Sequence, residues 1–221
     1  MGITFLWCLV ILLVVGCLLS LRVIYVIRKI RSFRTMKSSR IREQSSTATM
    51  KTMIIAGSGG HSTEILRLLS GIDTTRYKPR VYVVANTDRM SDGKITNFEK
   101  NGEHFEIVRI PRSREVKQSW STTVWSTLVA CLYCLPLTFY KSPDLILCNG
   151  PGTCIPLCLA GFLLTVLGVK KVAIVFVESI CRVETLSLSG KILHYFADEL
   201  IVQWPQLQLR YPQTRYIGKI V

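Results

Sequence analysis

The distribution of apolar residues divides this chain near residue 50. Before that point, Ile3 to Leu21 is an almost unbroken apolar segment, about as long as a helix that crosses a bilayer. After it, short runs rich in β-branched residues alternate with longer segments in which apolar residues recur every three or four positions. Runs of the first kind predict strands, and segments of the second kind predict helices.

The alternation after residue 50 predicts the fold class. Strands separated by helices indicate an α/β fold with a doubly wound, Rossmann-like parallel sheet. We therefore divide the chain into a membrane anchor with a basic linker, 1–48, and a Rossmann-like domain, 49–221. The expected strands are 53–56, 81–85, 105–110, 145–148, 172–177, 200–203 and 215–217, and the expected helices are 61–70, 91–100, 120–139, 153–168, 186–197 and 205–211.

Two of the predicted helices are unusually apolar. The helix at 120–139 carries Trp120 and Trp125, and Pro136 is expected to break it. The helix at 153–168 is apolar nearly all round but short for a membrane span. Both stand where crossover helices belong, so we expect them to pack on the sheet. The two tryptophans would be placed to enter the lipid headgroup layer.

Charge matters most beside the apolar segment. The chain has 28 basic and 14 acidic residues, a formal net charge of +14. The absence of basic residues before the segment, and of a clear cleavage site, argues against a cleaved signal peptide. By the positive-inside rule the cluster after it places the domain in the cytosol, and no nucleic-acid-binding module follows it. The cluster precedes the first acid, Glu43, and comprises Arg22, Arg28, Lys29, Arg31, Arg34, Lys37, Arg40 and Arg42.

A glycine-rich loop follows the first predicted strand. It reads Gly57, Ser58, Gly59 and Gly60, and His61 then opens a predicted helix. Glycines let the backbone approach a ligand closely, and the helix N-terminus attracts anions such as phosphate or diphosphate. Because Ser62 replaces the third glycine of a dinucleotide fingerprint and no P-loop lysine follows, a simple strand-to-helix turn remains an alternative.

A second loop of the same kind follows the fourth predicted strand. It contains Asn149, Gly150, Gly152 and Thr153, with Thr153 as the expected N-cap of the next helix. The carboxyl ends of parallel strands meet at one sheet edge, so the two loops could hold the two phosphates of a diphosphate. A tight turn at a crossover is the simpler interpretation.

Charged side chains follow two other strands. Glu178 ends the fifth predicted strand, where it would face the crevice as a base or bind a sugar hydroxyl, or pair with Arg182. Arg112 and Arg114 follow the third strand, where they could grip phosphate or lie in a solvated loop.

The chain has eight cysteines. In a cytosolic domain they are not expected to form disulfides. The spacings Cys131-x-x-Cys134 and Cys154-x-x-x-Cys158 occur in zinc sites, but both pairs lie in apolar runs. We therefore expect buried thiols rather than a metal site.

Taken together, these motifs resemble the N-terminal half of GT-B glycosyltransferases that act on lipid-diphosphate acceptors. Within that group the chain is most similar to the family of eukaryotic membrane-anchor subunits of a UDP-N-acetylglucosamine transferase, the enzyme that makes dolichol-diphosphate-chitobiose. The segments that carry the resemblance are GSGGH at 57–61, IPRSREV at 110–116, CNGPGT at 148–153, ESICRVETLS at 178–187 and KILHYFADELIVQWP at 191–205.

The resemblance implies an enzyme subunit. The enzyme adds the second N-acetylglucosamine to dolichol-diphosphate-N-acetylglucosamine in N-glycan precursor assembly, at the endoplasmic reticulum membrane. The anchor would cross once with its N-terminus in the lumen and the domain on the cytosolic face. A soluble partner subunit would bind UDP-N-acetylglucosamine and supply the second Rossmann-like domain. The apolar tail, 216–221, would dock on that partner or form the last strand of the sheet.

The same resemblance implies roles for individual residues. Both glycine loops, with Arg112 and Arg114, would hold the acceptor diphosphate, and His61 or Glu178 would deprotonate the acceptor 4-hydroxyl. Neutral histidine suits proton abstraction near neutral pH. The sequence has no acidic metal-binding motif, so we expect chemistry that needs neither metal nor cofactor.

Two other functions fit parts of the sequence. A pure membrane scaffold would leave all chemistry to the partner. A dinucleotide enzyme would need an acid about 20 residues after the loop, but Asp73 and Asp88 lie 16 and 31 residues after Gly57.

Overall fold

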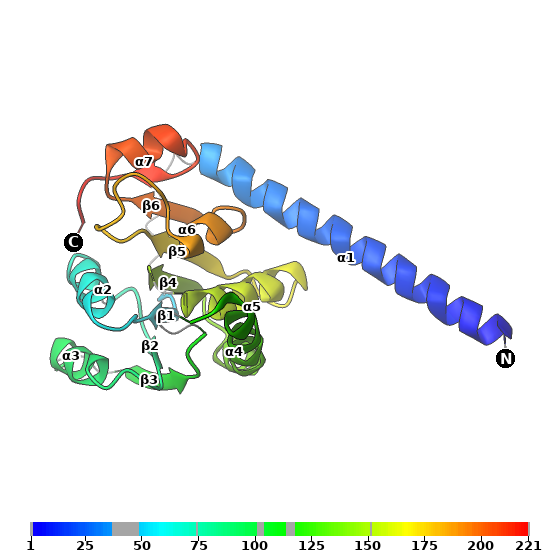
Figure 1. Ribbon diagram of the computed structural model, residues 1–221, viewed down its shortest axis with the longest axis horizontal. Helices are drawn as coiled ribbons and strands as arrows, with labels where there is room; N and C mark the ends of the chain where they lie inside the picture. Colours follow the sequence, from blue (N-terminus) through cyan, green and yellow to red (C-terminus); the bar gives the residue numbers. More distant parts are fainter. Residues whose placement is uncertain are drawn as a thin grey trace.

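A computed structural model describes residues 2–36, 49–73, 75–100, 104–113, 118–150 and 152–220. In it, a long N-terminal helix projects from an α/β domain, and the two ends of the chain lie on opposite sides of the molecule (Figure 1). Residues 37–48, the linker end of the expected anchor segment 1–48, lie outside the described residues, as does Arg114.

The domain is built on a fully parallel sheet with the order β3-β2-β1-β4-β5-β6-β7. The order reverses between β1 and β4, which lie side by side although a long stretch of chain separates them. This is the topological switch point at which doubly wound sheets bind ligands. The strands are β1 (Thr52–Ile55), β2 (Arg80–Ala85), β3 (Phe105–Ile110), β4 (Leu145–Asn149), β5 (Ala173–Val177), β6 (Glu199–Val202) and β7 (Arg215–Tyr216).

Helices cover both faces of the sheet. The helices α2 and α3 lie on one face, and α4 and α5 lie on the other (Figure 1). Each face buries its own apolar cluster, around Ile54, Tyr82 and Ile65 on the first and around Ile146, Phe176 and Leu157 on the second. The helices are α1 (Gly2–Met36), α2 (Gly60–Ser70), α3 (Ser91–Phe98), α4 (Trp120–Lys141), α5 (Cys154–Val166), α6 (Leu188–Leu193) and α7 (Pro205–Arg210).

The predicted doubly wound fold is confirmed, and most element boundaries differ from the prediction by one or two residues. The expected break at Pro136 is wrong, because α4 continues through it to Lys141. Proline in a helix interior costs about 3 kcal/mol. Ala130, Cys134 and Thr138 recur every four residues around it and are fully buried, so packing on both sides of the proline offsets that cost.

The helix α1 is longer than the apolar segment that predicted it. Its stretch Thr4–Arg34 is long and apolar enough to cross a membrane, and only 6% of its most apolar window is buried within the protein. The helix continues past Leu21 to Met36, through the first five residues of the basic cluster, and packs on α5 through Val26, Ile30 and Val166. One N-terminal apolar helix of this kind is typical of a membrane anchor.

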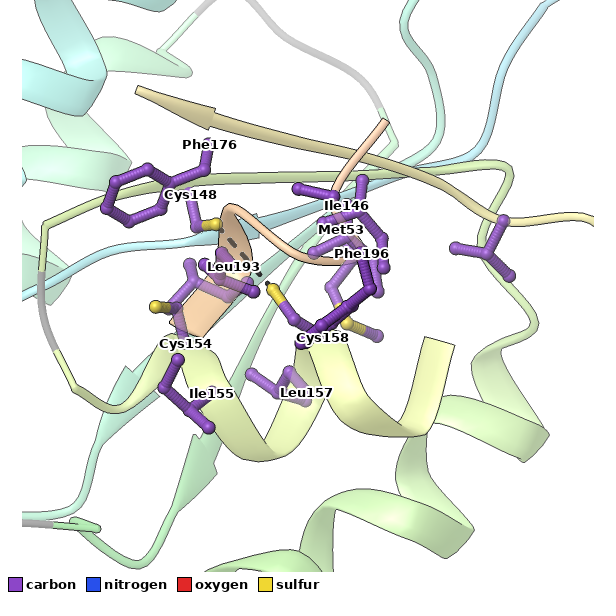
Figure 2. Close-up of a cluster of buried hydrophobic side chains, with 14 of the residues drawn as sticks. Met53, Ile146, Cys148, Cys154, Ile155, Leu157, Cys158, Phe176, Leu193 and Phe196 are labelled. Carbon is purple, nitrogen blue, oxygen red and sulfur yellow. Dashed lines mark hydrogen bonds between the residues drawn. The ribbon is translucent and has the colours of Figure 1, made fainter. Parts of the chain in front are cut away.

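The cysteines of the domain lie mostly in its core. Cys148 on β4 and Cys158 on α5 place their sulfurs 3.7 Å apart, and Cys154 lies beside them among Leu157 and Phe176 (Figure 2). Burial raises the pKa of the Cys148 thiol well above its ordinary value. A neutral thiol of this kind packs as a small apolar side chain.

Candidate functional site

The first glycine loop joins β1 to α2 at the switch point. Gly59, the residue before α2, has a φ of 67°, a left-handed conformation that side chains with a Cβ rarely adopt. The hydroxyl of Ser62 donates to the carbonyl of Gly57, and the ammonium of Lys94 donates to the carbonyl of Gly59 at 3.4 Å. These bonds hold the loop, and the first N–H groups of α2 have no acceptor within the helix itself.

The second loop leaves β4 beside the first one. Gly150 has a φ of 71°, so it too needs a left-handed conformation. Thr153 occupies the predicted N-cap position before α5, but its buried hydroxyl makes no capping bond there. The N-termini of α2 and α5 therefore adjoin at one sheet edge. Together they offer positive dipole ends to a single anionic ligand.

His61 lies where the two loops meet. Its Nδ1 lies 3.1 Å from Oδ1 of Asn149 and 3.8 Å from a carboxylate oxygen of Glu64, one helical turn further along α2. A Cβ on Gly150 would lie 2.6 Å from the same nitrogen. Only a glycine at position 150 leaves room for the imidazole in this position.

The hydrogen bonds around His61 define which nitrogen carries the proton. The amide nitrogen of Asn149 donates to the carbonyl of Val177 at 3.3 Å, so Oδ1 of Asn149 faces the imidazole as an acceptor. The Nδ1 of neutral His61 therefore donates, and its Nε2 keeps a lone pair. Glu64 is oriented in turn by the hydroxyl of Ser179, which donates to it at 2.9 Å.

Two further polar groups lie beside the loops. Arg112, two residues after β3, donates to the hydroxyl of Ser58 at 2.5 Å, which brings its guanidinium to the first loop. The hydroxyl of Ser113 is buried and has no partner among the described residues. It lies beside the second loop, 3.8 Å from where a Cβ on Gly152 would stand. An unpaired buried hydroxyl is costly unless a ligand or water satisfies it.

Glu178 occupies a different position from the one that its place after β5 indicated. Its side chain is fully buried and accepts bonds from the backbone N–H and the hydroxyl of Ser187 at 2.9 and 3.0 Å. Burial raises the pKa of Glu178, and the bonds from Ser187 and the charge of Arg182 only partly oppose this. The carboxylate braces the start of α6 and does not open into the crevice. Of the two candidate bases, only His61 therefore lies between the two glycine loops.

Asp88 also has a structural task. Its carboxylate accepts bonds from the backbone N–H groups of Met90 and Ser91 at 3.0 and 3.1 Å and from the Ser91 hydroxyl. Asp88 is only 5% exposed, so its carboxylate fixes the turn before α3 and is not accessible to a ribose.

Sequence reasoning missed four side chains of the site. Glu64 could have been noticed from its spacing of three from His61, which places both on one helix face. Ser113 and Ser179 adjoin Arg112 and Glu178, which were candidates, but neither serine was itself singled out. Lys94 reaches the first loop from α3, and no motif near it signals a site.

Comparison with known proteins identifies the family. Residues 52–220 match the model of the family described as oligosaccharide biosynthesis protein Alg14 like. The chain belongs to this family. The resemblance inferred from the motifs is thereby confirmed.

Individual members of the Alg14 family are similar over most of the chain. The human UDP-N-acetylglucosamine transferase subunit ALG14 is 53% identical over 182 residues, which cover 78% of this chain and 84% of the relative. The subunit of the same name from Schizosaccharomyces pombe is 44% identical over 171 residues, covering 75% and 81%.

Solved structures support the fold. An Acinetobacter baumannii MurG structure matches with a TM-score of 0.55 at 15% identity over 77% of this chain. A UDP-N-acetylglucosamine 2-epimerase matches with a TM-score of 0.55 at 14% identity over 76%. The chain spans 45% and 43% of those two proteins, about half the length of each.

Proposed function

We propose that this chain is the membrane-anchoring, acceptor-binding subunit of a UDP-N-acetylglucosamine transferase. The assembled enzyme adds the second N-acetylglucosamine to dolichol-diphosphate-N-acetylglucosamine at the cytosolic face of the endoplasmic reticulum. The observation that carries the proposal is the convergence of two glycine loops and two helix N-termini on His61, in a chain whose relatives are named as subunits of such a transferase.

The acceptor diphosphate lies between the loops after β1 and β4. The backbone N–H groups that begin α2 and α5 donate to its oxygens, and Arg112 and Lys94 add positive charge at the rim. The Ser113 hydroxyl is satisfied by the same ligand. A diphosphate supplies acceptors for all these donors, whereas an uncharged sugar alone would leave the cationic groups unmatched.

His61 acts as the general base. Its Nε2 takes the proton of the acceptor 4-hydroxyl while that oxygen bonds to the anomeric carbon of UDP-N-acetylglucosamine, and UDP leaves with the electrons of the broken bond. Asn149 and Glu64 contact Nδ1 and stabilise the imidazolium that forms. This arrangement lets the imidazole gain a proton without leaving its position.

A soluble partner supplies the donor half. Relatives that are named as subunits of a UDP-N-acetylglucosamine transferase support a second polypeptide that carries the nucleotide-sugar site. The half-exposed tail residues Tyr216 and Ile217, on and after the edge strand β7, offer an apolar contact for it.

The membrane holds the assembled enzyme at its substrate. The anchor α1 crosses the bilayer, and α4 exposes apolar side chains including Trp125, which is 70% exposed, and Leu132 and Tyr133. In Figure 1 α1 leaves the domain on the side of α4 and α5, so a bilayer around α1 meets this surface as well.

Turnover by the assembled enzyme tests the proposal. We expect His61→Ala to lower kcat by about 10²- to 10⁴-fold with little change in the acceptor KM, because only the proton transfer is lost. His104→Asn is the matched control, since His104 lies outside the site with a φ of 80°, which asparagine tolerates. Full turnover by His61→Ala in an enzyme with normal subunit association would leave a pure scaffold as the function.

A further inference from the structure

A cavity separates α1 from the domain on the side away from the glycine loops. It has a volume of about 510 Å³, within the range of small-molecule sites. One wall is the cytosol-proximal part of α1, and the other is formed by α5, β5 and the segment that begins β6. Its apolar floor includes Val26, Ile30, Phe162, Val172 and Phe196.

Positive charge dominates the polar part of the lining. Five basic side chains and two carboxylates line the cavity. Three of the basic groups are held by protein oxygens: Arg22 donates to the carbonyl of Val166 at 3.1 Å, Arg34 donates to that of His194 at 3.0 Å, and Lys170 pairs with Asp144 at 2.9 Å.

The two remaining cations have a different environment. Lys29 lies 5.9 Å from the ring centre of Tyr25, and Lys171 lies 5.5 Å from that of Phe33. Among the residues that the structure describes, neither ammonium meets a carboxylate at ion-pair distance. Lys29 comes from α1 and Lys171 from the segment before β5, so each wall of the cavity contributes one of these cations.

The level of the cavity along α1 indicates which kind of ligand would fit it. After the single Arg22 the chain is apolar again from Val23 to Ile27, and consecutive basic residues begin with Arg28 and Lys29. Lys29 therefore stands near the level of the lipid phosphates, where basic residues flank a membrane span. A cavity with an apolar floor and a cationic mouth at this level matches a diacyl lipid with an anionic headgroup.

We propose that this cavity binds one anionic glycerophospholipid of the leaflet from which α1 emerges. Its headgroup phosphate lies between Lys29 and Lys171, and its glycerol end and upper acyl carbons lie on the apolar floor. The lipid thereby bridges α1 and the sheet. The inference rests on the membrane anchorage proposed above, but it requires no role in sugar transfer.

Native mass spectrometry of the full chain with its partner subunit in detergent tests the site. The probes are dioleoylphosphatidylglycerol and the zwitterionic dioleoylphosphatidylcholine. We expect one phosphatidylglycerol to be retained per chain and no stoichiometric retention of phosphatidylcholine. In Lys29→Gln/Lys171→Gln, half-occupancy should need roughly tenfold more lipid, because two cations next to the phosphate are lost.

A matched double variant separates this site from general attraction to basic protein. Arg28→Gln/Lys100→Gln removes the same charge at exposed positions outside the cavity and should retain the lipid as the unmodified protein does. Equal losses in both double variants, with melting temperatures unchanged, would overturn the proposal, as would equal retention of the two lipids. The complex carrying His61→Ala should keep the lipid, so a failed catalytic proposal and a failed lipid site give different results.

Discussion

Gly150→Ala should disable the site from within the second loop. Two effects add. Alanine in the left-handed conformation costs about 1 to 2 kcal/mol, and the new Cβ would lie 2.6 Å from His61 Nδ1. Ordinary contacts between such atoms are about 3.5 Å, so the imidazole must move by roughly 1 Å. A displacement of that size costs about 10²-fold in turnover.

Turnover of UDP-N-acetylglucosamine with a short-chain analogue of dolichol-diphosphate-N-acetylglucosamine is the assay. Gly168→Ala is the matched control, because Gly168 has a φ of 73° but lies away from His61, so it carries the backbone cost alone. We expect kcat of Gly150→Ala to fall by about 10²-fold and that of Gly168→Ala to stay within twofold. Equal activities of the two variants would refute the placement of His61 against the second loop.

Three further predictions concern buried carboxylates. Arg80→Met should lower the free energy of unfolding by about 3 to 5 kcal/mol in chemical denaturation, because Glu99 would keep its buried charge without the ion pair, whose N···O distance is 2.6 Å. Burial alone would raise the pKa of Glu99, but hydrogen bonds from Arg80 and Tyr82 outweigh it and lower that pKa. The stabilising effect of the Glu99 carboxylate is therefore present above the pKa that Glu99 has in the unfolded chain, about 4.3, and is lost as the pH falls below that value. The free energy of unfolding, measured across pH, should show this loss, and Glu99→Gln should lack it. Glu178→Gln should keep turnover per folded enzyme within about threefold, since Glu178 is fully buried; a loss as large as that of His61→Ala would contradict its structural role.

The parallel sheet could be predicted from the sequence because its strands are short, rich in β-branched residues, and mostly bounded by glycine or proline. Their burial on both faces makes the apolar runs continuous, as in the fully buried β2 and β4. The position of both glycine loops follows from the strand ends, and the switch point follows from the topology. The break assigned to Pro136 failed because local preference was outweighed by packing of α4 along its buried face.

The inner arrangement of the site needed the folded chain. His61 and Asn149 are 88 positions apart, and their contact depends on the β1–β4 pairing that no local pattern encodes. Glu178 was assigned to the crevice from its place after a strand, but the N-cap residue Ser187 binds its carboxylate inside the domain. Chain separation of interacting groups therefore limits what sequence patterns can predict about a site.

The most direct test of the account is ligand binding by the full chain in detergent, without its partner. The two ligands are a short-chain analogue of dolichol-diphosphate-N-acetylglucosamine and UDP-N-acetylglucosamine. The account predicts that the chain binds the lipid-linked diphosphate sugar and that Gly59→Val, which forces a β-branched residue to a φ of 67°, abolishes this binding. It also predicts no binding of the nucleotide sugar. Tight binding of UDP-N-acetylglucosamine by this chain alone would contradict the assignment of the acceptor half.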